Sequence, residues 1–449
     1  MNAIAPVGRS LAPFEARLDG IEDPIRHAAV GELRRVGLPG PRVEAWRYTH
    51  LRPLAGHEFR EAAASFDADP VGRALDESLP RDGLLASTPR LVLVNGRFAP
   101  ELSSPANGVA LPEGVTFERF SASPEFDALA TPEREPLVAL NTALATDGVR
   151  LSVAEGVAAE RIVLVSVACA GDEAVSFHPR HSVSLGAGAS LELIELAVSS
   201  GSGAGAATYF HNPVLTCDVR EGAKLTHVKV QKEAAGATHL ATVYANIAAR
   251  GAYDSFTLGL GSDLARHEVH ARLSGAKAAV HVNGAQLLGE KQVGDITSVI
   301  THAAPDCISR QTIRNVLTDH ARGVFQGKVH VHQIAQKTDG YQMNQALLLS
   351  PHAEIDAKPE LEIYADDVKC SHGATVGALD DEQLFYLRSR GVPEAQARRI
   401  LVEAFLLEVL DLHEDEAGRA LLDTALGAAL SLRIGREQVP GQAAGEVSE

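Results

Sequence analysis

The chain has few cysteines and spreads them widely. Only 4 occur in 449 residues, at Cys169, Cys217, Cys307 and Cys370, and none forms a C-x-x-C pair. Their separation excludes a disulfide framework, and it excludes a complete set of thiolates for a zinc ion or a metal cluster. A reducing compartment, the cytoplasm, is therefore the expected location.

Other features are missing as well, and each absence removes a class of function. No run of about 18 apolar residues occurs, and the amino terminus lacks the layout of a secretory signal, so we expect neither a membrane span nor export. The net charge of −17 argues against chain-wide binding to nucleic acid or anionic lipid. Neither a P-loop nor a dinucleotide-binding glycine motif is present, so the usual nucleotide sites are excluded.

Aromatic residues are also scarce, at 5% of the chain with Trp46 as the one tryptophan. A β-helix enzyme that cleaves polysaccharides would need clustered carboxylates and aromatic platforms for sugars, and the sequence offers neither.

The chain does have enough apolar residues for a large core, since 45% of it is hydrophobic. The texture of the sequence changes along the chain and predicts four parts. Residues 1–150 form an N-terminal region of mixed helix and strand, and residues 151–378 form a β-helix core. Residues 379–435 form a C-terminal helical domain, and residues 436–449 are a flexible tail.

The β-helix prediction rests on an imperfect repeat of short apolar runs that follow small-residue turns. The runs are GASLELIEL at 188, GAKLTHVKV at 222, GAYDSFTLGL at 251, GAKAAVHVNG at 275, GVFQGKVHV at 323 and the weaker HAEIDAKPELEI at 352. Their spacings are 34, 29, 24, 48 and 29 residues, and 48 would hold two units of 24. A mainly β, right-handed parallel β-helix is the preferred fold, and a β-sandwich or double-barrel cupin is the alternative.

Local signals predict several elements outside the repeat. Residues 14–36 read as one helix that ends at GLPGP, RLVLVNGRF as a hairpin turning at Asn95-Gly96, and EPLVALNTALA as a helix. Near the carboxyl end, Asp380 and Gln383 resemble a capping box, Gly391 ends that helix, and two more helices follow Pro393.

Cys370 and His372 are the first candidate site. Residues two apart on a strand point to the same side, so these two side chains should share a face with Val368. Two ligands cannot close a metal site, which usually needs about four. Composition alone therefore favours a buried cysteine beside a hydrogen-bonded histidine.

Other histidines compete with this pair. His330 and His332 would project two imidazoles to one side of a strand, as a cupin metal site does, and Asp366 and Asp367 could add carboxylates. The spacing of three between His267 and His270 in RHEVH suits a helix better than the strand expected there. Each of these histidines alone is more typical of a surface or a hydrogen-bonded core position.

The segment ILVEAFLLEVL, which begins at Ile400, is apolar except for Glu403 and Glu408. A helix that is apolar nearly all round must be covered on most sides. Flanking helices of the same small domain account for much of that cover, and docking of a second protein is the alternative. In that case four arginines would form a charged rim, namely Arg388, Arg390, Arg398 and Arg399.

Longer stretches carry a resemblance. Residues 335–392, which include CSHGATVG, resemble the SufB/SufD family of iron–sulfur cluster assembly proteins, and RVEAWRYTHLRPL near Arg42 resembles its amino-terminal segment. CSHGATVG is most like the SufD branch. Departures from the family pattern are Gly340 and Gln345-Ala346, and neither is expected to touch Cys370 or His372.

The resemblance implies a parallel β-helix scaffold subunit without catalytic turnover of its own. Such a subunit pairs with a SufB-like subunit through the β-helix, carries a SufC-like ATPase on its C-terminal helices, and passes clusters to apo-proteins. His372 and Cys370 would face transient iron or a nascent Fe–S cluster at the SufB interface, with no cofactor held permanently.

The predicted contacts of the ATPase are Leu384, Phe385, Arg388, Phe405 and Leu406. The alternative function is a metal-dependent β-helix or cupin-like enzyme that uses His330 and His332.

Overall fold

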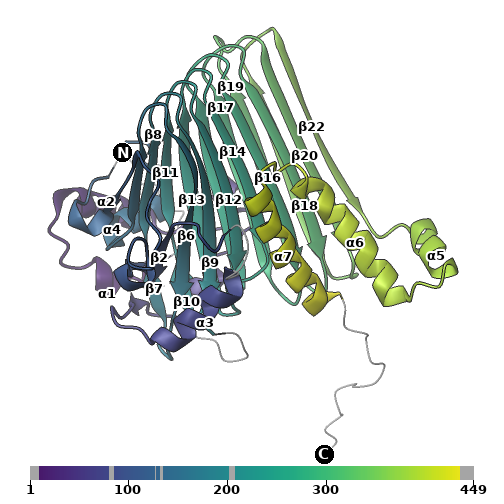
Figure 1. The fold of residues 1–449 in the computed structure, drawn as a ribbon, viewed down its shortest axis with the longest axis horizontal. Helices are drawn as coiled ribbons and strands as arrows, with labels where there is room; N and C mark the ends of the chain where they lie inside the picture. Colours follow the sequence, from purple (N-terminus) through teal and green to yellow (C-terminus); the bar gives the residue numbers. More distant parts are fainter. Residues whose placement is uncertain (1–9, 80–84, 127, 132–134, 202–207, 435–449) are drawn as a thin grey trace, which may run out of the picture.

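A computed structural model describes residues 10–79, 85–126, 128–131, 135–201 and 208–434. The predicted tail, residues 436–449, lies outside these ranges. Two sheets face each other along most of the molecule, and helices lie against one face and at both ends (Figure 1).

The first sheet has ten strands. Its order is β22 (Val368–Gly377), β20 (Thr338–Leu348), β18 (Ile308–Leu317), β16 (Ala279–Leu288), β14 (Ala252–Gly259), β12 (Lys224–Lys232), β9 (Ser190–Ser199), β6 (Ala158–Ala168), β2 (Arg90–Val94) and β3 (Arg97–Phe98). We call it the ten-stranded sheet.

The second sheet has twelve strands. Its main path is β21 (Glu354–Ile363), β19 (Arg322–Val331), β17 (Val293–His302), β15 (Leu264–Leu273), β13 (Ala237–Ile247), β11 (Val214–Val219), β8 (Arg180–Leu185), β5 (Val149–Val153) and β4 (Val115–Arg119). Three short strands pair alongside: β1 (Arg60–Glu61), β7 (Val175–Phe177) and β10 (Tyr209–His211). We call it the twelve-stranded sheet.

The chain alternates between the two sheets and winds a parallel β-solenoid of about seven turns, so the predicted β-helix is confirmed. Ala252, Ala279 and Ile308 are successive register partners, which places one turn at 27 to 29 residues. GAKAAVHVNG runs into β16, whereas GVFQGKVHV lies in β19 of the other sheet. The interval of 48 therefore joins strands of two sheets, and the prediction that it holds two units of 24 is wrong.

The interior of the solenoid is apolar at one end of each strand and polar at the other. Leu225, Tyr253 and Val280 are register partners on successive turns and are fully buried. Farther along the same strands, Glu195 pairs in register with Lys229, and both side chains are buried. The interior thus contains a polar zone beside its aliphatic core.

The amino-terminal region holds short helices and the edges of both sheets. Its helices are α1 (Glu15–Leu18), α2 (Pro24–Val36), η1 (Glu44–Trp46), η2 (Arg52–Leu54), α3 (Ala68–Ser78), η3 (Pro100–Leu102), η4 (Phe120–Ala122) and α4 (Pro136–Leu144). The single helix predicted over residues 14–36 is divided, because Gly20 adopts a φ of +76° and Asp23 caps a new helix. The hairpin is confirmed, with φ of +50° at Asn95 and +76° at Gly96, and so is the helix of EPLVALNTALA.

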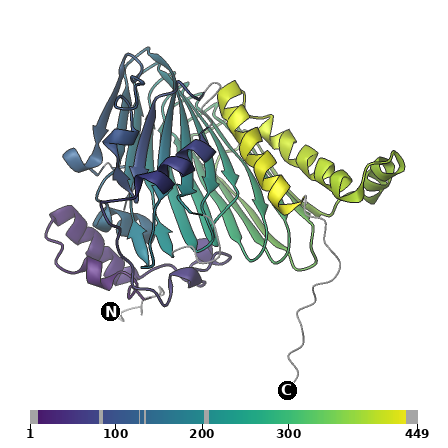
Figure 2. The same cartoon turned by 60° about the horizontal axis from the view of Figure 1, so that its bottom comes forward.

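Three helices follow the last strand: α5 (Asp381–Ser389), α6 (Glu394–Leu410) and α7 (Glu416–Arg433). Asp380 caps α5 by accepting bonds from the backbone N–H groups of Glu382 at 2.8 Å and Gln383 at 3.1 Å. Both views show α6 and α7 beside the ten-stranded sheet, with α5 projecting away from the body (Figures 1 and 2).

The cover of α6 differs from the expectation of flanking helices. Val402, Leu406 and Val409 pack with outward-facing residues of the ten-stranded sheet, such as Leu287 and Val316. A sheet face therefore supplies much of the burial that the sequence assigned to neighbouring helices. In the described ranges, no helix combines the length and apolar character that crossing a bilayer requires.

Candidate functional site

Cys370 and His372 lie on β22, the last strand of the ten-stranded sheet. Cys370 pairs in register with Gly340, and His372 pairs with Gln342, which faces the interior. Cys370 packs with Val368 against the interior residues of the last turn, and the alternation of side chains along β22 turns His372 to the same side. Cys370 is half-buried and His372 is exposed, since no further turn covers this end of the solenoid.

Cys370 is held as a thiol in the free chain. Burial raises the pKa of the Cys370 thiol above its ordinary value, although a backbone hydrogen bond at Gly340 opposes the shift. A Cβ atom at position 340 would lie 3.3 Å from the Cys370 sulfur. The expectation that Gly340 does not touch Cys370 is therefore wrong, and this departure gives the sulfur its room.

A row of buried polar side chains leads inward from His372. Gln311 and Gln342 are the successive register partners behind it, and both are fully buried. The Gln342 side-chain oxygen and nitrogen have no hydrogen-bond partner among the described residues. Burying an amide without a hydrogen-bond partner costs free energy. The interior behind His372 is therefore polar and is not an ordinary apolar core.

His330 and His332, the alternative pair, do lie together but on a different surface. Their ring centroids are 4.9 Å apart. His330 pairs in register with Glu362 within the twelve-stranded sheet, on the outer face of that sheet. Burial, followed by His330, lowers the pKa of His332. Within the described ranges neither histidine belongs to a group of three side chains that can share a metal ion, so the enzyme alternative gains no support.

The remaining histidine and aspartate candidates do not join the Cys370 pair. His267 and His270 lie on β15, where an odd separation places them on opposite faces. His267 faces the interior, and His270 lies 3.0 Å from Glu268. Asp366 and Asp367 are exposed in the turn before β22.

The predicted ATPase contacts divide into exposed and buried residues. Phe385 is 74% exposed on α5, where Tyr386 is exposed beside it, and Arg388 is exposed with an ion pair to Glu394 at 3.3 Å. Leu384 and Leu406 are buried. Phe405 is half-buried beneath the Arg314 guanidinium, 4.7 Å from its ring centroid. Of the five predicted contacts, only Phe385 and Arg388 are exposed to a partner.

The last turn also presents two unpaired strand edges. β21 and β22 are the terminal strands of their sheets, each paired on one side only. Pro359, at the middle of β21, has no backbone N–H, so it cannot donate a hydrogen bond to a neighbouring strand, and proline is tolerated at such an edge. Exposed edges of this length are templates for pairing with another chain.

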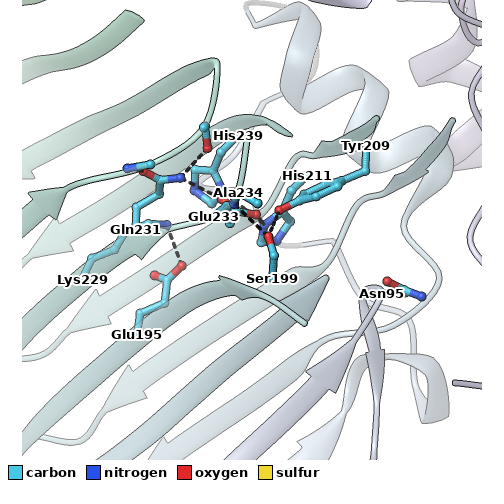
Figure 3. Close-up of polar contacts among 12 residues, drawn as sticks. Asn95, Glu195, Ser199, Tyr209, His211, Lys229, Gln231, Glu233, Ala234 and His239 are labelled. Carbon is cyan, nitrogen blue, oxygen red and sulfur yellow. Dashed lines mark hydrogen bonds and ion pairs between the residues drawn. The ribbon is translucent and has the colours of Figure 1, made fainter. Parts of the chain in front are cut away.

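Sequence reasoning missed a set of buried polar residues in the interior, shown in Figure 3. Lys229 Nζ lies 2.6 Å from Glu195 Oε1, and His211 and His239 gather around Glu233. His211 and His239 are register partners on β10 and β13. Nothing in their separation along the sequence marks His211 and His239 as neighbours, and only the register of the turns brings them together.

Comparison with known proteins places these features in a family. Residues 167–405 match the family described as SUF system FeS cluster assembly, SufBD core domain, and residues 19–165 match the SufBD protein N-terminal region. The iron–sulfur cluster assembly protein SufD of Escherichia coli (strain K12) is 33% identical over 415 residues, 92% of each chain. A SufBD family assembly protein of Synechocystis sp. is 32% identical over 414 residues, 88% of this chain and 89% of the relative.

Proposed function

Because the chain belongs to the SufBD family of SUF-system iron–sulfur cluster assembly proteins and is SufD-like, we propose that it is a scaffold subunit. It pairs with a SufB-like subunit, carries a SufC-like ATPase and helps to build nascent Fe–S clusters for apo-proteins. It has no turnover of its own, and ATP is hydrolysed by the partner. None of the four cysteines forms a disulfide, which suits the cytoplasm.

One observation carries this proposal: the site at the open end of the solenoid is chemically incomplete. Cys370 and His372 face the same side of β22, yet neither belongs to a group of three metal-ligating side chains in the described ranges. A complete set of thiolates would hold a cluster firmly. A half-site that a partner completes allows iron and sulfide to be assembled at the seam and then released as substrate.

The unpaired edges support a position for the partner at the open end of the solenoid. Cys370 and His372 lie on β22, and β21 ends the other sheet at the same end of the solenoid, so a SufB-like chain that pairs with these two strands covers the half-site. Strand addition uses main-chain hydrogen bonds for affinity and neighbouring side chains for specificity. The raised pKa of Cys370 then falls only when the partner or the metal ion supplies positive charge.

The ATPase docks on the projecting helix α5 in this proposal. Phe385, Tyr386 and Arg388 form an exposed aromatic and cationic patch, which is the composition typical of interface hot spots. Leu406 contributes indirectly, because it fastens α6 to the ten-stranded sheet. Movement of the ATPase is thereby transmitted to the sheet that carries Cys370.

The test is to co-express the chain with SufB-like and SufC-like partners, purify the complex without oxygen, and measure its iron and sulfide. His372→Ala is expected to lower the cluster content at least about tenfold while the complex still forms. His330→Ala, on the outer face of the solenoid, is the matched control and is expected to leave the content unchanged. Unaltered iron and sulfide in His372→Ala would refute the site, and failure to bind either partner would refute the scaffold function.

A further inference from the structure

We propose that His211, Glu233 and His239 form a buried binding site for a divalent transition-metal ion. This site lies inside the solenoid and is distinct from the half-site at its open end. The inference does not rest on the proposed function, because it depends only on the arrangement of these three side chains.

The three side chains come from adjacent turns of the chain and converge on one point (Figure 3). His211 lies on β10, Glu233 directly follows β12, and His239 lies on β13 in register with His211. His239 Nδ1 is 2.7 Å from Glu233 Oε2, and His211 Nδ1 is 3.1 Å from Glu233 Oε1. The two Nδ1 atoms are 3.1 Å apart.

These separations suit atoms that share an ion. Imidazole nitrogens and carboxylate oxygens bind zinc at about 2.0–2.2 Å, which places neighbouring ligands about 3.3 Å apart at tetrahedral angles. As a purely hydrogen-bonded group, the cluster is awkward. If both Nδ1 atoms carry hydrogen toward Glu233, the two N–H groups face each other.

The charge of the cluster also calls for a cation. Glu233 is fully buried, and its two histidine neighbours, each 1% exposed, bring no permanent positive charge. Lys229, the nearest ammonium along β12, is already paired with Glu195 at 2.6 Å. A buried carboxylate without a cationic partner is costly, and a metal ion removes that cost.

Two other groups in the described ranges bring three metal-ligating side chains together, and both already contain a guanidinium. In the group formed by Glu192, His413 and Asp415, Arg161 binds Glu192 at 2.7 Å and Asp415 at 2.9 Å.

In the group formed by Glu135, Glu268 and His270, Arg266 binds Glu268 at 2.8 Å. No Arg or Lys contact of this kind reaches Glu233 among the described residues, which sets the His211 group apart.

The surroundings orient the carboxylate and leave a small space beside one of the histidines. Gln231 Nε2 donates to Glu233 Oε2 at 3.0 Å and orients the carboxylate. A cavity of about 20 Å³ beside His239, lined also by Lys229, Gln231 and His267, has room for about one water molecule. The nitrogens that converge on Glu233 are the Nδ1 atoms of His211 and His239, and the Nε2 atoms of the two rings are buried without a partner among the described residues.

The donor set indicates the class of metal. Two imidazoles and one carboxylate with an open position are typical of zinc and of non-haem ferrous iron, whereas calcium and magnesium prefer oxygen ligands alone. We therefore expect Zn²⁺, Fe²⁺ or the probe ion Co²⁺ to bind, and Mg²⁺ and Ca²⁺ not to compete.

The test uses the full chain without an affinity tag, metal-depleted and loaded with Co²⁺ in two ways: in the native state, and during refolding from guanidinium. We expect about one equivalent of Co²⁺ with visible d–d absorption by at least one route. Glu233→Gln is expected to weaken binding at least about tenfold, while Glu160→Gln, the same change at an exposed position, is the control and binds as the parent does. Absence of bound Co²⁺ after both routes, or unchanged affinity in Glu233→Gln, would overturn the proposal.

X-ray absorption of the Zn²⁺-loaded parent protein keeps the proposal testable if Glu233→Gln fails to fold. We expect a first shell of nitrogen and oxygen only, with the outer-shell signature of two imidazoles. Sulfur in the first shell would place the ion at a cysteine and refute the assignment.

Discussion

Charged residues inside the solenoid are mostly held in matched pairs. Lys229 Nζ and His227 Nε2 lie 2.6 Å and 3.0 Å from the carboxylate oxygens of Glu195. Burial opposes the charged carboxylate, but Lys229 and His227 hold the pKa of Glu195 well below its usual range. Removing one member of such a pair leaves a buried charge, so the polar zone depends on each residue being kept with its partner.

Glu135, at the start of α4, differs from these paired residues because its pKa is raised, and this shift has a measurable consequence. Burial, followed by the nearby Glu268 carboxylate, raises the pKa of Glu135 to about 7. The unfolded chain releases this proton near pH 4.3, whereas the folded protein keeps it until about pH 7. Stability contributed by this group is therefore present below about pH 4.3 and is lost as the pH rises toward 7.

Glu135→Gln removes this proton release. We expect the variant to exceed the parent in free energy of unfolding by up to about 3 kcal/mol at pH 8, and to match it at pH 5 within about 1 kcal/mol. Urea unfolding at the two pH values measures the difference. Glu160→Gln, at an exposed position, is the control. A gain in the free energy of unfolding of the same size at both pH values would show that the pKa of Glu135 is not raised.

At the scale of elements, α6 and α5 have different tasks. α6 is fixed to the ten-stranded sheet by Leu406, which is 0% exposed, and by Arg314. The Arg314 guanidinium lies over the Phe405 ring and donates to the Phe405 carbonyl and to Glu408. α5 has only Leu384 buried and carries its aromatic side chains outward. α6 is therefore fixed to the sheet by buried contacts, whereas α5 keeps its aromatic side chains exposed.

Two alanine substitutions separate these tasks. Leu406→Ala is expected to lower the free energy of unfolding by about 2–5 kcal/mol, because it leaves a cavity between α6 and the sheet. Phe385→Ala is expected to change it by less than about 0.5 kcal/mol. Urea unfolding checks both values.

Phe385→Ala is expected to bind the SufC-like ATPase at least about tenfold more weakly than the parent, because truncating a hot-spot residue removes much of the binding energy. Surface plasmon resonance gives the affinity, and Glu382→Ala on the same helix is the control. Equal affinities of the Phe385 variant and the parent would move the docking site away from α5.

The elements were predictable where the signal is local. Asp380 and Gly391 bound α5 as expected, and Asn95-Gly96 makes the hairpin turn, because caps and turns depend on a few adjacent residues. The interval of 48 could not be interpreted from the spacing of apolar runs, since each turn contains two strands and the runs at 275 and 323 lie in different sheets. The His211 group was missed for the same reason, because contacts between turns require the register.

At the scale of the whole molecule, the two ends of the solenoid differ. At the amino-terminal end, the antiparallel strands β3 and β4 close the two sheets and short helices cover them. At the other end, β21 and β22 are mostly exposed or half-buried along their length. In a solenoid each turn is stabilised by its neighbours, so the last turn lacks half of its support.

Hydrogen exchange should report this asymmetry. In the free chain we expect the amides of β22 to exchange at least about tenfold faster than those of β16, which is paired on both sides. Binding of a SufB-like subunit is expected to slow exchange in β21 and β22 and to leave β12 unchanged, because strand pairing protects only the edge that it covers. Mass spectrometry of peptides from the free chain and the complex measures both effects. Protection of β22 equal to that of β16 in the free chain would contradict the predicted asymmetry, and no change on complex formation would show that the open end is not where the partner binds.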